Sequence, residues 1–228
     1  MQDAQALRIT VADLKASLGA AKVRLIDARP PAEYAAGHVA GAVNFDPFPP
    51  YATIDTSPAG LSAFFHMMSE VFGRLGIAPT SRVICYDATS GVRAARLVWL
   101  LHAMGHAEAV IVDGGMQAWQ AAGYPVEEAV PDVTPTTFTP RLRGSLVAGF
   151  EDVLAGLSDP KVVLWDVRSE GEHYGETVRS KRGGTIPGAI HYEWTNNLDG
   201  NGCFKDLEVI RRELEARGIT PEKEIIPF

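Results

Sequence analysis

The chain has 228 residues, 46% of them hydrophobic, and a formal net charge of −7. This length suits one large or two ordinary domains, and the acidic balance argues against nucleic acid or an anionic membrane surface as the main partner. Two cysteines cannot build a disulfide framework, and no apolar run reaches the roughly 20 residues that span a bilayer. Because no signal-peptide pattern opens the chain, the sequence predicts a soluble, cytoplasmic protein.

The first third of the chain predicts helices that alternate with strands. The apolar run 23–26 suits a buried strand, and residues 45–59, rich in proline and aromatic side chains, predict a surface excursion. Thr10 is a cap signal for the first helix and Gly76 a C-terminal cap for the third. Helices are expected at 9–18, 32–36 and 61–75.

The stretch 75–97 predicts a strand, a tight loop and a helix. The strand covers 83–86, the small-residue loop 87–92, and the helix opens near Arg93. The first N–H groups of a helix lack intrahelical partners and face the positive end of its dipole, so this arrangement favours an anion. A carboxylate at Asp87 can accept hydrogen bonds from those N–H groups.

The rest of the first half continues the alternation. Residues 109–112 predict another buried strand, and a turn and a helix with Trp119 facing inward follow it. This order indicates an α/β fold with a parallel sheet covered by helices on both faces. Residues 127–143 are rich in proline and threonine and predict an extended linker between a domain at 1–126 and a second at 144–228.

The second half repeats the first. Residues 147–157 predict the leading helix, and 161–165 the strand. DVRSEGE then repeats DARPPAE, and GGTIPGAIH at 183–191 matches GHVAGAVN at 37–44. The paired residues are Asp27 with Asp166, Arg29 with Arg168, and Glu33 with Glu172.

The repeat continues through a second amphipathic helix at 207–217 to the end of the sequence. RGITPEKEIIPF at 217–228 matches the approach to the first loop, so the position equivalent to Asp87 is the one directly after Phe228. The loop, helix, strand and helix that follow Asp87 have no counterpart in the second copy. We therefore expect the second domain to be incomplete at its C-terminus, truncated before its own loop.

The order and spacing of these motifs resemble the tandem-domain rhodanese family of sulfurtransferases. The likeness consists of two copies of D-x-R-x-x-x-E followed by G-[HT]-[VI]-x-G-A, with VICYD, LHAMGH and VDGGMQAW in the first copy. It implies two rhodanese-like domains, the first inactive, and a nucleophilic cysteine directly after Phe228. That cysteine would take a sulfane sulfur as a persulfide, and a thiolate at such a loop has a lowered pKa.

The resemblance also implies roles for residues that are present. Asp166, Arg168 and Glu172 would support the active loop, with a structural ion pair as the alternative reading of Asp166 and Arg168. Trp194 would border the pocket, or pack between domains. A basic segment found only in the second copy would attract an anionic donor, or be a solvated loop, and its members are Arg179, Lys181 and Arg182.

Other candidate residues receive structural interpretations. Cys85, in a buried strand, is predicted to be a core residue, and Cys203 has no adjoining base that would make it the nucleophile. His38 is predicted to be hydrogen-bonded and structural. Thr185 and His173 depart from the family pattern, which has a histidine and an aromatic there. The histidines and cysteines show no metal-ligand spacing, and no metal or cofactor is predicted.

The sequence thus predicts an enzyme that moves sulfur from thiosulfate to a thiophilic acceptor such as cyanide. Its partners would be a small sulfur donor and the acceptor, without nucleic acid or membrane, and no oligomeric state is predicted. A 3-mercaptopyruvate sulfurtransferase is the first alternative and a non-catalytic rhodanese-like binding module the second. A phosphatase on the related fold, with a wider cysteine loop, is the third.

Overall fold

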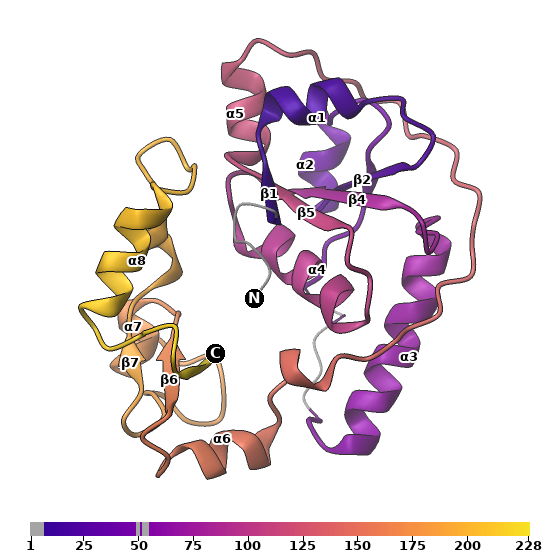
Figure 1. The fold of residues 1–228 in the computed structure, drawn as a ribbon. Helices are drawn as coiled ribbons and strands as arrows, with labels where there is room; N and C mark the ends of the chain where they lie inside the picture. The colour runs from indigo at the N-terminus through magenta and orange to yellow at the C-terminus, as the bar shows by residue number, and fades with distance from the viewer. Residues whose placement is uncertain (1–6, 49–50, 52–54) are drawn as a thin grey trace. The chain divides into compact units, whose positions relative to one another are not determined.

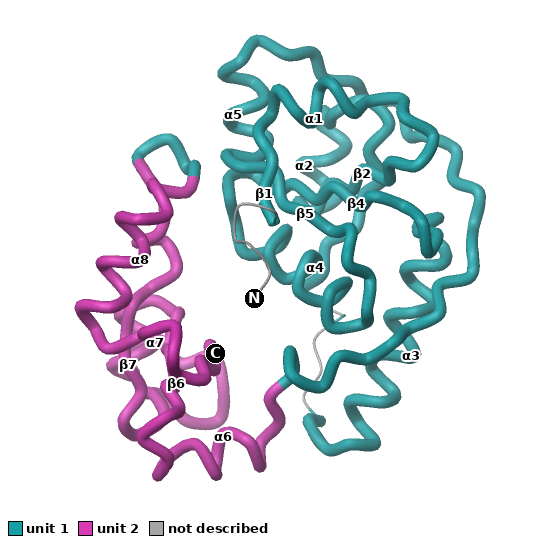
Figure 2. The backbone as a smooth tube through the Cα atoms, in the orientation of Figure 1, with its two compact units in different colours: residues 1–147, 200–203 teal, residues 148–199, 204–228 magenta. Residues whose placement is uncertain are grey.

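The chain divides into two compact units, each with its own parallel sheet (Figures 1 and 2). The computed structural model describes residues 7–48, 51 and 55–228. Unit 1 comprises residues 1–147 and 200–203, and unit 2 comprises 148–199 and 204–228. The first six residues, which contribute to the predicted absence of a signal peptide, lie outside the described ranges.

Unit 1 is built on a five-stranded sheet in the order β1-β5-β4-β2-β3, in which every neighbouring pair is parallel. Parallel strands need crossover connections, and helices supply most of them here. The strands are β1 (Arg8–Ile9), β2 (Val23–Asp27), β3 (Val43–Asn44), β4 (Arg82–Tyr86) and β5 (Ala109–Val112).

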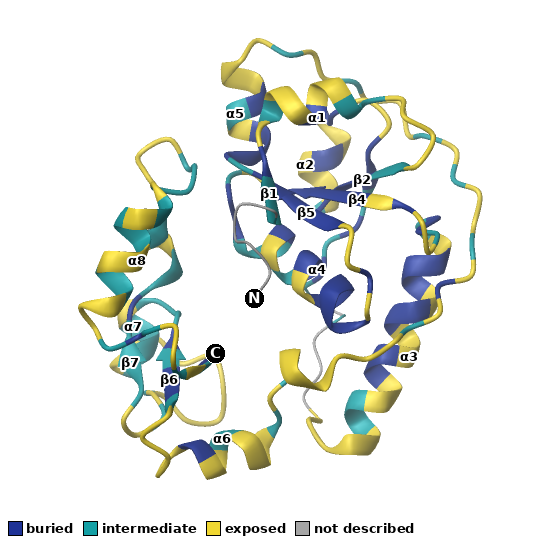
Figure 3. Ribbon diagram, in the orientation of Figure 1, coloured by how far each residue is buried: buried dark blue, intermediate teal, exposed yellow. Residues whose placement is uncertain are grey.

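Helices lie on both faces of this sheet, as predicted (Figure 1). On one face α1, α2 and α5 lie over the sheet, and on the other lie α3 and α4. The central strands of this sheet are largely buried (Figure 3), because side chains that point to opposite sides of the sheet both meet helices. The helices are α1 (Val11–Ser17), α2 (Pro31–Ala35), α3 (Pro58–Arg74), α4 (Val92–Ala103) and α5 (Gly115–Ala121).

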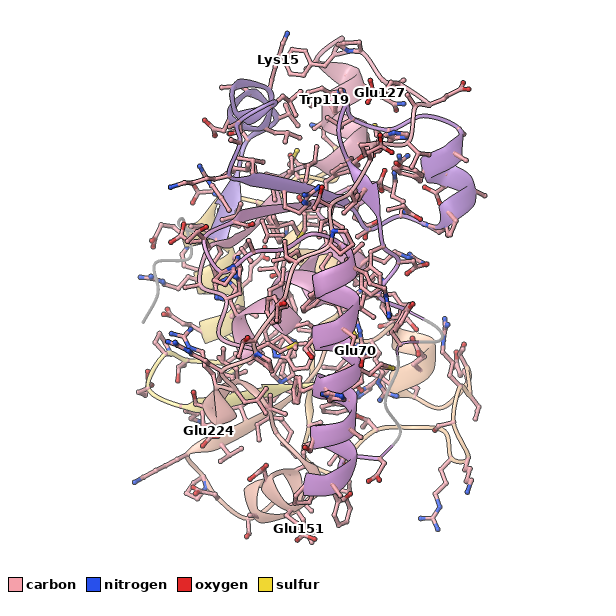
Figure 4. All side chains as sticks on the ribbon, turned by 90° about the vertical axis from the view of Figure 1, so that its right-hand side faces the viewer. Lys15, Glu70, Trp119, Glu127, Glu151 and Glu224 are labelled. Carbon is pink, nitrogen blue, oxygen red and sulfur yellow. The ribbon has the colours of Figure 1, made fainter. Side chains whose placement is uncertain are left out.

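Local signals in the sequence explain where these helices begin and end. Thr10 forms a capping box with Asp13 at the start of α1. Gly76, with φ of 70°, follows the last turn of α3 in the left-handed conformation that favours glycine. Trp119 on α5 is 2% exposed and packs edge-on against Tyr124, and the Lys15 ammonium of α1 lies 4.0 Å from the centre of that tyrosine ring. Figure 4 labels Trp119 and Lys15. The predicted inward position of Trp119 is confirmed.

Two sequence predictions in unit 1 need correction. Ile9 was expected in the first helix, but it pairs with Val112 as part of the two-residue strand β1. The predicted surface excursion at 45–59 begins with a core residue, because Phe45 is buried against Phe72 and Tyr51. The positions 49–50 and 52–54 of that excursion lie outside the described residues.

The predicted linker at 127–143 is extended, but it is also bound to unit 1. Glu127 pairs with His38 in an antiparallel bridge, and the backbone N–H of Thr136 donates to the Gly73 carbonyl of α3 at 2.9 Å. The N–H of Arg141 donates to the Met104 carbonyl at 2.8 Å. Because the segment satisfies its backbone groups on unit 1, it covers that unit in addition to connecting it.

Unit 2 holds a three-stranded parallel sheet in the order β7-β6-β8. A short 3₁₀ turn, η2 (Gly144–Leu146), precedes it at the end of unit 1, and another, η3 (Trp194–Asn197), follows β7. The strands are β6 (Val162–Asp166), β7 (Ile190–His191) and β8 (Glu224–Pro227), and the helices are α6 (Phe150–Gly156), α7 (Glu170–His173) and α8 (Leu207–Glu215).

The two sheets share one register where the sequence repeats. In unit 1, β2 pairs with β4 from Val23 opposite Arg82, and in unit 2, β6 pairs with β8 from Val162 opposite Glu224. Asp27 lies opposite Asn44 on β3, and Asp166 lies opposite His191 on β7 in the same way. The two aspartates therefore occupy equivalent places, at the carboxyl end of a central strand.

Among the described helices, none has both the length and the apolar character required to cross a membrane.

Candidate active site

The loop after β4 in unit 1 is occupied by its own carboxylate. Asp87, which is buried, accepts hydrogen bonds from the backbone N–H groups of Ala88 at 2.7 Å and Arg93 at 3.0 Å. These are the hydrogen bonds that the sequence predicts for Asp87, and they use donors at the entrance to α4 that would otherwise attract an external anion.

The same loop is held by further contacts within unit 1. The hydroxyl of Ser90 donates to Asp113 at 2.8 Å and accepts from the N–H of Gly114 at 2.7 Å. The N–H of Ser90 donates to the Gly202 carbonyl at 2.9 Å. Gly115 has φ of 52°, and a Cβ there would collide with the Asp87 carbonyl. Only glycine lets α5 begin this close to the loop.

Asp166 is the centre of a hydrogen-bonded cluster in unit 2. Its Oδ1 accepts from the backbone N–H of Arg168 at 3.1 Å and from Nε at 2.9 Å. Its Oδ2 accepts from Arg168 Nη2 at 2.7 Å, Thr185 Oγ1 at 2.7 Å and His173 Nδ1 at 3.0 Å. Burial alone would raise the pKa of Asp166, but the hydrogen bonds from Arg168, Thr185 and His173 outweigh burial and hold that pKa well below its ordinary value.

The corresponding ion pair in unit 1 has the same framework. Arg29 donates to Asp27 from its backbone N–H at 2.9 Å and from Nη2 at 2.6 Å, and that Nη2 also donates to the Gly37 carbonyl. Arg168 Nη2 likewise donates to the Gly184 carbonyl at 3.1 Å. In both units the arginine thus joins the aspartate to the turn before the next strand.

An aromatic residue at the end of β4, and another directly after β8, lies against the arginine of each ion pair. The Arg29 guanidinium lies over the Tyr86 ring at 5.8 Å, and the Arg168 guanidinium lies over the Phe228 ring at 5.3 Å. The N–H of Val167 donates to the Phe228 carbonyl at 3.2 Å, and the N–H of Phe228 donates to Trp165 at 3.0 Å. Phe228 is therefore held against Arg168 by its ring and against Trp165 and Val167 by its backbone.

Two histidines belong to the unit 2 cluster, and sequence reasoning did not place them there. His173 stacks on His191 with ring centroids 4.4 Å apart. His191 Nε2 lies 2.9 Å from the Arg168 carbonyl, and because a carbonyl only accepts, Nε2 carries the proton. Asn44 makes the equivalent bond to the Arg29 carbonyl at 2.8 Å. Aligning the two copies residue by residue would have indicated this pair of partners.

Glu172 and the basic segment lie at the edge of this cluster. Ser169 caps α7, and Glu172, three residues later, completes the capping box. A Glu172 carboxylate oxygen accepts a hydrogen bond from the Ser169 hydroxyl at 2.9 Å. Its other oxygen pairs with Arg179 Nε at 3.1 Å, although the Arg179 side chain is 75% exposed. Lys181 and Arg182 are exposed as well. Of the three basic residues, the structure brings Arg179 to a predicted site residue.

Trp194 lies next to the segment that follows Asp166. It opens the 3₁₀ turn η3, and its backbone N–H donates to the Val167 carbonyl at 3.0 Å. Its residue surface is partly buried. Val167 is thus bonded through its carbonyl to Trp194 and through its N–H to Phe228.

The structural interpretations of Cys85 and His38 are confirmed. Cys85 is fully buried in β4, and burial raises the pKa of its thiol far above the ordinary value. His38 is buried and stacks on Tyr34 at 3.8 Å, and its Nδ1 and Nε2 lie 3.0 and 3.2 Å from the carbonyls of Tyr34 and Ala129, to one of which the ring N–H donates. Cys203 is partly buried in unit 1.

Comparison with known proteins relates this chain to a known family. Residues 10–122 match the rhodanese-like domain family. The chain is 34% identical to a thiosulfate sulfurtransferase of Azotobacter vinelandii, over 96% of this chain and 81% of that protein. It is 28% identical to the human 3-mercaptopyruvate sulfurtransferase, over 85% of this chain and 67% of that protein.

A solved structure agrees with the sequence comparisons. SseA from Escherichia coli, described as a 3-mercaptopyruvate sulfotransferase, superimposes with a TM-score of 0.82 at 25% identity, over 97% of this chain and 87% of that one. The parallel α/β fold and the long match to the Azotobacter protein show that the chain belongs to the rhodanese family of sulfurtransferases.

Proposed function

We propose that this protein transfers a sulfane sulfur from thiosulfate to a thiophilic acceptor such as cyanide. The nucleophile would be a cysteine at the position directly after Phe228. The position of Phe228 supports the proposal. Its ring lies under the Arg168 guanidinium and its carbonyl accepts the Val167 N–H, at the carboxyl end of a parallel sheet. Ligands of open α/β sheets bind at that end.

The reaction would proceed by two displacements. The cysteine thiolate attacks the outer sulfur of thiosulfate, a sulfur–sulfur bond forms on the enzyme, and sulfite leaves with the electron pair of the broken bond. Cyanide then attacks the outer persulfide sulfur, thiocyanate leaves, and the thiolate is restored. Backbone N–H groups at the loop and the following helix would stabilise both anionic forms of the sulfur.

Unit 1 supports this assignment by contrast. Its equivalent loop holds Asp87, whose carboxylate uses the N–H groups of Ala88 and Arg93. A carboxylate cannot carry a sulfane sulfur, so we assign a structural role to this loop. The two units would then be two rhodanese-like domains, one structural and one active, in a protein that we place in the cytoplasm.

The relatives favour thiosulfate over 3-mercaptopyruvate as the donor. The matches to thiosulfate sulfurtransferases of Azotobacter vinelandii and Pseudomonas aeruginosa reach 34% and 33% identity, whereas the human mercaptopyruvate enzyme reaches 28%. In the unit 2 cluster, Arg168 is neutralised by Asp166. We therefore assign donor attraction to the exposed basic segment of Arg179, Lys181 and Arg182, in which Arg179 is paired with Glu172 but its side chain is 75% exposed, with Trp194 at the border of the pocket.

Donor competition tests the proposal. A chain carrying the segment after Phe228 is supplied with thiosulfate and cyanide, and thiocyanate is measured; parallel reactions contain 3-mercaptopyruvate. We expect a higher kcat/KM with thiosulfate, and a mass gain of one sulfur atom when thiosulfate is given alone. Replacing the residue after Phe228 by alanine is the matched control and should abolish both signals.

Three results would contradict the proposal. A higher kcat/KM with 3-mercaptopyruvate would reassign the donor. Turnover of an aryl phosphate without sulfur transfer would indicate a phosphatase. No turnover and no sulfur gain with either donor would leave a rhodanese-like binding module.

A further inference from the structure

We infer that His173 is a positioning residue for the active loop: with Thr185, it fixes the Asp166–Arg168 pair on which Phe228 is seated. This inference rests on the proposed function, because it assigns the cluster to the loop that follows Phe228. The contacts that support it are those in which the two units differ at equivalent positions of the repeat.

In unit 1 one hydroxyl from the sheet completes the ion pair. Tyr86 Oη donates to Asp27 Oδ2 at 2.7 Å and accepts from the N–H of Val39 at 3.1 Å. Tyr86 is the last residue of β4, so the strand that enters the loop is bonded directly to the aspartate. The neighbouring Tyr34 and His38 stack on each other and leave Asp27 without a bond from either ring.

In unit 2 the aspartate accepts its hydroxyl hydrogen bond from Thr185, which lies outside the strands. Phe228 occupies the place of Tyr86 and offers no donor to Asp166. The positions of Tyr34 and His38 hold His173 and Thr185, and both now donate to Asp166 Oδ2, at 3.0 and 2.7 Å. The loss of one hydroxyl therefore coincides with the gain of two donors on the same carboxylate oxygen.

This exchange gives His173 a specific task. Without a hydroxyl, Phe228 makes no direct bond to Asp166: its ring lies under the Arg168 guanidinium, and its backbone bonds to Trp165 and Val167 on either side of Asp166. The orientation of Arg168 depends on the carboxylate, and the carboxylate is oriented by His173 and Thr185. A histidine that donates from Nδ1 is itself oriented by its stack on His191 at 4.4 Å.

Amide hydrogen exchange in a chain carrying the segment after Phe228, with no sulfur donor present, tests the inference without sulfur transfer. The reporters are the N–H groups of Val167 and Phe228, which join the end of β8 to β6. His173→Phe keeps a ring against His191 and removes the donor, so we expect both reporters to exchange about tenfold faster, the effect of losing one hydrogen bond to a charged group. Amides earlier in β6, such as Val163, should be unaffected.

Two rescue variants separate positioning from general stability. His173→Asn keeps an N–H donor near the place of Nδ1 and should restore slow exchange. Phe228→Tyr, added to His173→Phe, restores the hydroxyl that unit 1 uses and should do the same. Tyr174→Phe, a change at an exposed neighbour, is the control and should have no effect.

The inference is wrong if His173→Phe leaves both reporters unchanged, if all of β6 exchanges faster to the same degree, or if neither rescue variant slows exchange. Because exchange is read without a sulfur donor, these results are independent of the proposed reaction. A failed transfer assay with intact rescue would reject the reaction and keep the role of His173 in seating Phe228.

Discussion

Asp27 and Asp166 show how one carboxylate can be completed by different neighbours. Both lie at the end of a central strand and both accept a fork of hydrogen bonds from the arginine two residues later. Burying a carboxylate is costly unless such donors satisfy it. The structural ion-pair reading of Asp166 and Arg168 therefore agrees with the geometry, and the role that we propose for them at the active loop is compatible with it.

Asp166→Asn should destabilise the fold in a pH-dependent way. The pKa of Asp166 lies below its value in the unfolded chain, so its contribution is present above about pH 4 and is lost as the pH falls toward the folded-state pKa. We expect a cost of about 3 kcal/mol at pH 7 in urea unfolding, shrinking below pH 4. The exposed control Asp132→Asn should be neutral, and an equal cost at pH 7 and pH 3 would contradict this explanation.

Cys85 should be inert while the protein is folded. Its thiol is buried in β4, and burial opposes the thiolate that reacts with disulfide reagents. In a Cys203→Ser variant, which retains Cys85, we expect no labelling by an aromatic disulfide in buffer and full labelling in guanidinium chloride. Rapid labelling in buffer would show that this part of the β4 core opens readily.

At the scale of elements, the sequence predicts those helices and strands whose signals lie in adjacent residues. The Thr10 cap, the Gly76 terminus and the strand at 109–112 follow from local signals and are present. β1 was missed because two residues carry no periodicity and acquire their pairing from β5. The unit 2 cluster was missed in part for the same reason, since His191 reaches Arg168 only after the strands have paired.

The extended segment at 127–143 gives a prediction at this scale. A Cβ on Gly73 would lie 2.7 Å from the Thr136 carbonyl, so α3 and the segment approach as closely as a glycine allows. Gly73→Ala should lower the free energy of unfolding by about 1–3 kcal/mol, despite the better helix propensity of alanine. Gly144→Ala, where a Cβ meets nothing within 4 Å, is the control. Unchanged thermal unfolding of Gly73→Ala would show that the segment moves aside at little cost.

The whole molecule combines two related sheets with unequal loops. The register of β2 with β4 is reproduced by β6 with β8, but one loop entrance ends in Tyr86 and Asp87 and the other reaches Phe228. The repeat and the family could be predicted from sequence because both depend on motif order. The exchange among Tyr86, His173 and Thr185 could not be assigned, because it appears only when three separate elements meet.

The difference between the loop of unit 1 and the proposed active loop of unit 2 predicts different effects of mutation in the two units. In a chain carrying the segment after Phe228, Arg168→Lys removes the guanidinium fork and should lower kcat for thiosulfate by about 10- to 100-fold, since misplacing a loop by about 1 Å can cost that much. Asp87→Asn in unit 1 should leave kcat unchanged. Thiocyanate formation measures both, and a matching loss in the Asp87 variant would show that unit 1 takes part in transfer.

Unit 1 is not continuous along the chain, because residues 200–203 belong to it and the Gly202 carbonyl accepts the Ser90 N–H. During synthesis, Gly200 is added roughly 3 to 10 s after Val147 at about 5–20 residues per second. Until then the nascent first unit lacks this partner for Ser90. The loop that contains Ser90 therefore reaches its final arrangement only after part of the second half has been made, and a ribosome stalled before Gly200 would carry a first unit without this hydrogen bond.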